Sequence, residues 1–105
     1  MSNTIEWGDF TKVDMRVGQI VSVSDFPEAR NPSYILNVDF GSLGTKKTSA
    51  QVTNYKKEDL LDRLVVAVFN FSPKQIGPIM SEVLVLGAVE NDGTVRLLKP
   101  DPDCE

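Results

Sequence analysis

The side chains of this 105-residue chain that could take part in chemistry favour binding over catalysis. There is no histidine, so no imidazole is available as an acid, a base or a metal ligand, and the single cysteine, Cys104, stands next to last. The carboxylates lack calcium-loop spacing, and Gly41-Ser-Leu-Gly44 has neither the lysine–serine pair of a phosphate-binding loop nor the GxGxxG pattern of a dinucleotide-binding loop. The sequence therefore predicts no catalytic residues, no metal site and no cofactor, and a binding module is a better interpretation than an enzyme.

Polar and basic side chains remain as candidates for ligand contacts. Residues 31–74 carry six basic and four acidic groups, a local charge of +2 in a chain of net charge −4. Clustered cations attract phosphates, although a nucleic-acid-binding domain is usually basic overall, and each lysine could equally lie on a solvated surface. The candidate residues for binding nucleic acid or peptide are Arg30, Lys46, Lys47, Ser49, Gln51, Asn70, Lys74 and Ser81.

Some of these residues also have structural interpretations. The Asn70 amide could bond a ligand, or it could bond the backbone of its own loop. Ser49 and Gln51 alternate with apolar neighbours, so they face either a binding groove or solvent. Ser81 opens an expected strand, where a hydroxyl could equally serve as a strand-edge hydrogen bond.

Hydrophobic periodicity predicts six short strands, with a short helix after the third. Gly18 within the first strand predicts a bulge or a sharp bend, and residues 72–78 are expected to form a loop. Asp9 is expected to cap a single helical turn, and Asn54 is expected to cap the helix. The strands are expected over Met15–Val23, Ser33–Phe40, Lys46–Thr53, Leu64–Phe71, Glu82–Val89 and Val95–Leu98, and the helix over Asn54–Asp62.

This order of elements predicts an all-β fold. It matches an OB-fold Greek-key barrel of five to six short strands with one short helix between strands three and four, whereas the rival SH3-like barrel lacks that helix. Tyr34 and Phe40 are expected in its core. The length suits one domain over residues 1–105, with a loose acidic tail from about residue 100. No apolar run approaches the ~18 residues that span a membrane, and no signal peptide is visible, so a cytoplasmic location is expected.

Four stretches form a pattern that runs in register from residue 10 to residue 87. They are Phe10-Thr-Lys-Val-Asp-Met-Arg-Val-Gly18, Asp39-Phe-Gly41 with Thr48-Ser-Ala-Gln-Val-Thr53, Asn70-Phe-Ser-Pro-Lys-Gln-Ile76 and Ser81-Glu-Val-Leu-Val-Leu-Gly87. The pattern resembles the EMAP/Trbp-type tRNA-binding domains, and in particular their CsaA-like branch. The resemblance implies a small homodimeric OB-fold, a chaperone-like factor related to protein export with a tRNA-binding ancestry.

Two functional hypotheses follow from the residues and the resemblance together. The first is the capture of unfolded or exported polypeptides by a homodimer without membrane insertion. The alternative is a tRNA-binding module, although Asn31 and Ile35 stand where the related loop carries two lysines. Apolar residues in expected loops and ends mark the predicted dimer interface, although residues 76–80 could instead plug the barrel. The interface candidates are Trp7, Phe10, Ile76, Ile79 and Met80.

Overall fold

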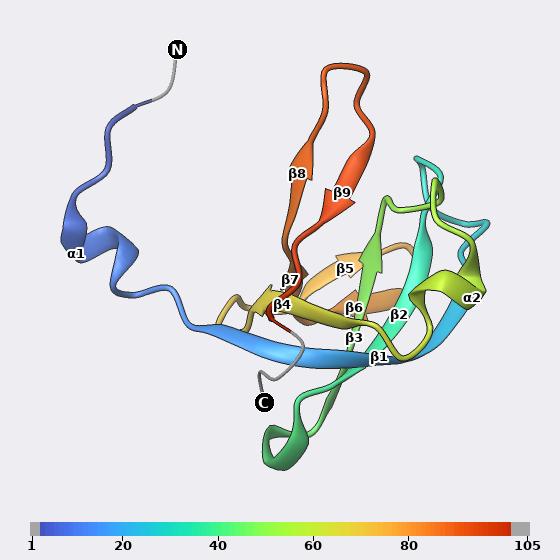
Figure 1. Ribbon diagram of the computed structural model, residues 1–105, viewed down its shortest axis with the longest axis horizontal. Helices are drawn as coiled ribbons and strands as arrows, with labels where there is room; N and C mark the ends of the chain where they lie inside the picture. Colours follow the sequence, from blue (N-terminus) through green and yellow to red (C-terminus); the bar gives the residue numbers. More distant parts are fainter. Residues whose placement is uncertain (1–2, 102–105) are drawn as a thin grey trace.

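Five antiparallel strands form a twisted, nearly closed barrel in the computed structural model, which describes residues 3–101 (Figure 1). The strand order is β3-β2-β1-β4-β7, and the short helix α2 (Lys57–Leu60) lies between β3 and β4 in the chain. The predicted all-β OB-fold is therefore confirmed. Cys104 and residues 102–105 of the expected acidic tail lie outside the described residues. The strands are β1 (Met15–Asp25), β2 (Tyr34–Asp39), β3 (Thr45–Ala50), β4 (Leu64–Val68) and β7 (Leu84–Val85).

Alternating apolar residues fill the barrel, as the two-residue period predicts. Leu36 and Val38 on β2 are fully buried, while Asp39 is exposed. Phe40 is buried as expected and packs edge-on against Phe69, with ring centroids 5.1 Å apart. The core consists of Ile20, Leu36, Val38, Phe40, Val52, Leu60, Val65, Ala67, Val83 and Leu97, and Tyr34 packs against it.

Polar groups close the barrel where β3 meets the chain that leads into β7. The Glu82 backbone N–H donates to the Lys47 carbonyl at 2.8 Å, and the Lys47 N–H donates to Glu82 Oε1 at 2.9 Å. The Thr48 hydroxyl donates to the Val83 carbonyl at 2.8 Å and lies 2.9 Å from the Ser81 hydroxyl. Within residues 3–101, Thr48 is the buried polar side chain, and these bonds satisfy it.

Gly18 does not form the predicted bulge. The register irregularity in β1 lies between Ile20 and Ser22 instead. At Gly18, a Cβ atom would lie 2.5 Å from Val38 Cγ1 and 2.8 Å from the Phe40 ring. The position therefore needs glycine because core side chains of β2 approach its backbone closely.

Both predicted helix caps are wrong in detail. The first turn, α1 (Trp7–Phe10), begins after Glu6, and Asp9 accepts the Glu6 N–H from inside the turn as part of a capping box. Asn54 does not cap α2, because its side chain donates to the Val95 carbonyl at 3.1 Å. α2 follows Lys56 and ends before the expected Asp62, whose φ is +67°.

Two short hairpins extend the barrel, and both alter the predicted elements. The expected loop at 72–78 contains β5 (Lys74–Ile76), which pairs with β6 (Ile79–Ser81) across a turn where Gly77 has a φ of +54°. The expected strand at 82–89 divides into β7 and β8 (Gly87–Val89), and β8 pairs with β9 (Val95–Leu97).

The β8–β9 hairpin projects from the barrel, and the N-terminal arm with α1 extends away from it (Figure 1). At the hairpin tip, the Thr94 N–H donates to Asp92 and lowers the pKa of that carboxyl. No helix within residues 3–101 is long and apolar enough to cross a membrane.

Candidate functional site

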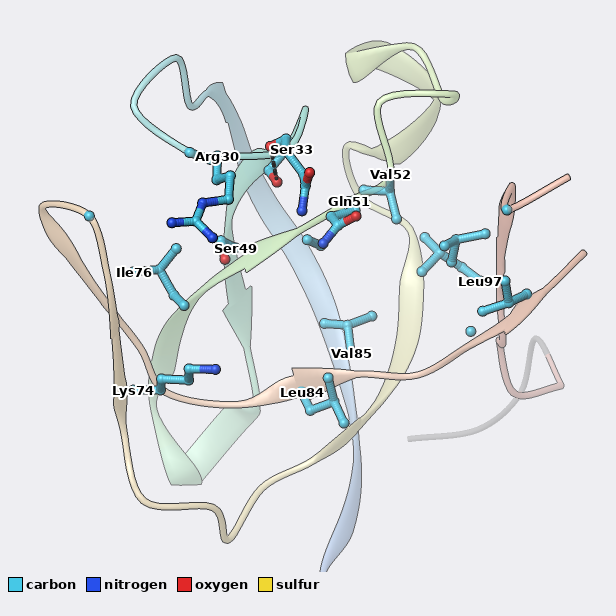
Figure 2. A pocket seen from close by; sticks show the side chains of 18 of the residues that line it. Arg30, Ser33, Ser49, Gln51, Val52, Lys74, Ile76, Leu84, Val85 and Leu97 are labelled. Carbon is cyan, nitrogen blue, oxygen red and sulfur yellow. Dashed lines mark hydrogen bonds between the residues drawn. The ribbon is translucent and has the colours of Figure 1, made fainter. Parts of the chain in front are cut away.

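A groove of about 1000 Å³ runs along one side of the barrel. Its walls come from the loop at 26–33, the end of β3, the β5–β6 hairpin, β7 and the β8–β9 hairpin (Figure 2). The groove brings together four candidates that lie far apart in the sequence: Arg30, Ser49, Gln51 and Lys74.

The two sides of this groove differ in polarity. Figure 2 shows Arg30 and Lys74 on one side, with Ile76 between them in that view. Val52, Val85 and Leu97 line the opposite side. A basic, polar side thus faces an apolar side across the groove.

A smaller hollow of about 330 Å³ adjoins the groove. Ser49, Lys74, Ile76 and Leu84 line both spaces. The smaller hollow adds another candidate, Ser81, together with Phe71 and Glu82. Sequence reasoning did not select Phe71, although it follows Asn70 directly and keeps 56% of its surface exposed.

The register of the β5–β6 hairpin explains how its candidates come to share a face. Lys74 pairs with Ser81, and Ile76 pairs with Ile79, so their side chains lie on one side of the hairpin. Met80 pairs with Gln75 and points to the other side, where it is exposed. The predicted interface residues Ile76 and Ile79 are half-buried, and the register places them on the side of the hairpin opposite to Met80.

Among residues 3–101, Arg30 and Lys74 form no ion pair with a carboxylate. Glu28 is the other charged residue of the large groove, so its described lining carries two positive charges and one negative. Its net charge is thus opposite in sign to that of the whole chain. Unpaired cations of this kind are available to an anionic ligand.

The three ion pairs of the described chain lie outside the groove. They join Arg16 to Asp14 at 2.7 Å, Lys57 to Asp25 at 2.9 Å, and Arg96 to Glu90 at 3.0 Å. Hydrogen bonds to these carboxylates raise the pKa of Lys57 and of Arg96.

Lys46 and Lys47 do not line the two hollows. As neighbours in β3 they point to opposite faces of the strand. Lys46 Nζ lies 5.7 Å from the centroid of the Phe69 ring. Lys47 shares the face of Ser49 and is exposed.

Asn70 also lies outside both hollows, where it holds the N-terminal arm. Its Oδ1 accepts the Asp14 N–H at 3.0 Å, and its Nδ2 donates to the Lys12 carbonyl at 2.7 Å. The arm itself carries Trp7, 77% exposed, whose ring centroid lies 5.7 Å from that of Phe10.

The barrel with its laterally open groove is the architecture of an OB-type binding domain. The family model described as "Putative tRNA binding domain" matches residues 15–105, so the chain belongs to this tRNA-binding domain family. The chain is 37% identical over 99 residues to the methionine–tRNA ligase of Thermococcus onnurineus. It is 41% identical over 98 residues to that of Nanoarchaeum equitans. These matches cover 94% and 92% of the chain but only 13% and 12% of the ligases.

Two solved structures are similar over nearly their whole length. The CsaA chaperone protein from Picrophilus torridus has a TM-score of 0.89 and 55% identity, over 93% of this chain and 92% of that one. The chaperone CsaA from Bacillus anthracis has a TM-score of 0.90 and 44% identity, over 97% and 94%. The resemblance noted in the sequence is therefore confirmed.

Proposed function

We propose that this chain binds tRNA in the large groove. The observation that carries the proposal is the placement of two unpaired cations, Arg30 and Lys74, beside Ser49 and Gln51 in a domain of the tRNA-binding family. Lysine and arginine would contact phosphates, and the hydroxyl and amide would bond sugars or bases. A cytoplasmic location, where tRNA is found, is part of this proposal.

Removing one groove cation tests the proposal. The salt slope is the slope of log affinity against log salt concentration, and each phosphate contact on single-stranded RNA adds about 0.7 to its magnitude. One such contact therefore gives about a fivefold gain in affinity at 0.1 M relative to 1 M salt. Lys74→Ala should therefore weaken tRNA binding about fivefold at 0.1 M salt. Lys56→Ala removes the same charge outside both hollows and should change affinity much less. Equal losses in both variants would contradict a groove-specific contact.

A second candidate function is the capture of polypeptides, as the two similar CsaA chaperone proteins suggest. The apolar side of the groove, formed by Val52, Val85 and Leu97, could accept apolar side chains of an extended peptide. A role in protein export belongs to this candidate. A panel of apolar and basic peptides should then bind with little salt dependence. The absence of peptide binding at high micromolar concentration would exclude it.

We also propose that the chain forms a homodimer. Exposed apolar side chains on the N-terminal arm and on the barrel surface support this proposal, since such surfaces commonly mark interfaces. Trp7 and Phe10 remain the arm candidates, and Met80 remains the candidate on the outward side of the hairpin. Ile76 and Ile79 remain candidates on its other side.

A further inference from the structure

We propose that the smaller hollow is a subsite for one unpaired nucleotide whose base carries an exocyclic amino group. The proposal rests on the proposed RNA binding, and it names the part of the ligand that this hollow recognises. Three features support it: the exposed ring of Phe71, the carboxylate of Glu82 and the cation of Lys74, all of which line the hollow.

Phe71 supplies a surface for base stacking. Its side chain is 56% exposed, and it belongs to neither of the aromatic pairs found in residues 3–101. No aromatic residue of the described chain lines the larger groove, so Phe71 is the aromatic surface that a bound strand would meet. Every base has a π-face, and stacking on an aromatic side chain contributes about five- to a hundredfold in affinity.

Glu82 supplies a hydrogen-bond acceptor of fixed position. Its Oε1 accepts the Lys47 N–H at 2.9 Å, and its own backbone N–H donates to the Lys47 carbonyl at 2.8 Å. Its second carboxylate oxygen has no hydrogen-bond partner within residues 3–101. A carboxylate accepts from the amino group of cytosine, and the adenine amino group offers the same kind of donor, whereas uracil presents a carbonyl oxygen at that edge. The hollow should therefore favour cytosine and adenine over uracil.

Lys74 supplies the contact to the phosphate. It lies opposite Ser81 on the hairpin face that lines the hollow, and it makes no ion pair in the described chain. Lys74 and Ser49 also line the larger groove. A strand in the groove could thus continue into the hollow without leaving the protein surface.

Fluorescence anisotropy with labelled single-stranded octamers of adenine, cytosine or uracil tests this subsite. The adenine and cytosine octamers should bind about tenfold more tightly than the uracil octamer, the low end of the discrimination that a hydrogen-bonded base contact gives. Phe71→Ala should weaken all three at least fivefold without changing the salt slope, because stacking displaces no counterions. Phe71→Trp should retain affinity. Leu61→Ala, which truncates an exposed apolar residue outside both hollows, is the matched control and should bind as the wild type does.

Glu82→Gln tests the base preference separately. The amide oxygen can still accept the Lys47 N–H, while the amide nitrogen now donates to the ligand. The preference for cytosine and adenine should disappear or turn toward uracil. An unchanged preference would overturn the assignment to amino-bearing bases.

The outcomes distinguish the subsite from the function on which it rests. If tRNA and the octamers bind but Phe71→Ala, with unchanged unfolding, binds as tightly as the wild type, the subsite is wrong and the groove proposal stands. If neither tRNA nor any octamer binds the wild type at low salt, RNA binding itself fails. If Phe71→Ala instead weakens only an apolar peptide, the hollow is a polypeptide site and the nucleotide assignment is overturned.

Discussion

Asn70 illustrates how a residue that invites a functional interpretation can also have a structural use. Both ends of its amide bond the backbone of residues that precede β1, across more than fifty positions of sequence. The sequence placed Asn70 at the end of a buried strand but could not show that the N-terminal arm returns to that point. Its contribution to ligand binding stays a prediction.

Asn70→Ala should release the arm from the barrel. The Asp14 amide would lose its acceptor, so its hydrogen exchange should accelerate by about tenfold, the equivalent of one hydrogen bond of about 1.4 kcal/mol. Exchange at Val65 in the core should change little. Unchanged exchange at Asp14 would show that the Asn70 contact does not hold the arm.

Gly18 gives a second test on the scale of single residues. Gly18→Ala should destabilise the fold by about 1–3 kcal/mol, because the new methyl group overlaps Val38 and Phe40. Urea unfolding measures the change. Gly8→Ala is the control, since nothing lies within 4 Å of a Cβ at that position. A loss of stability as large in Gly8→Ala as in Gly18→Ala would contradict this explanation.

Among the elements, the barrel strands were predictable, and so were the turns at Gly41–Gly44 and at Asn91-Asp92-Gly93, which join paired strands. The β5–β6 hairpin was not. Strands such as β2 bury one face more completely than the other, so their two-residue period can be recognised in the sequence. In the β5–β6 hairpin each strand has three residues, and prolines flank or interrupt the segment, so local pattern favours a loop. The division of the expected strand at 82–89 depends on long-range bonds of Leu86, whose N–H donates to Val66 and whose carbonyl accepts from Leu98.

The same limit applies to the groove. Residues of the loop, β3 and the hairpin meet there only because the barrel closes. The residue types could therefore identify Arg30, Ser49, Gln51 and Lys74 as candidates, but they could not predict that these residues share one groove. Phe71 was missed because the sequence predicts a buried strand over Leu64–Phe71, where an aromatic residue is most often core, whereas β4 ends at Val68.

Closure of the barrel through Thr48 can be tested directly. Thr48→Val should cost about 1–3 kcal/mol of the free energy of unfolding, because the Val83 carbonyl loses its donor in a buried setting. Thr48→Ser keeps the hydroxyl and should recover most of that loss. Denaturant unfolding of the two variants provides the comparison, and equal stability of Thr48→Val and wild type would contradict this role.

On the scale of the whole molecule, an apolar surface lies on the outside of the barrel. Met15 pairs with Val68, and Val68 pairs with Leu84, so the three share one face. Val66 lies on this face too, since its neighbours Val65 and Ala67 point into the core. We name Met15, Val66, Val68 and Leu84 the outer apolar face, in which Val68 is buried and Leu84 also lines both hollows. Sequence reasoning missed it because β4 is apolar throughout and gives no sign of which side is open.

If two copies associate through this face, light scattering should give about twice the 11.6 kDa mass of the chain. Met15→Glu would bury an unpaired charge there and should return the mass to that of one chain. Leu61→Glu places the same charge on an exposed residue elsewhere and should leave the dimer intact. A stable dimer forms well below a concentration of about 100 micromolar. A wild type that remains a single chain at that concentration would therefore exclude this assembly.

The central claim, that the groove binds tRNA through Arg30 and Lys74, is tested most directly by a salt titration of tRNA binding. The wild type is compared with the double variant Arg30→Ala/Lys74→Ala. If each cation contacts one phosphate of a single strand, the slope of log affinity against log salt should fall by about 1.4 in the double variant. A wild-type affinity that does not depend on salt, or a slope unchanged by the double substitution, would contradict the claim.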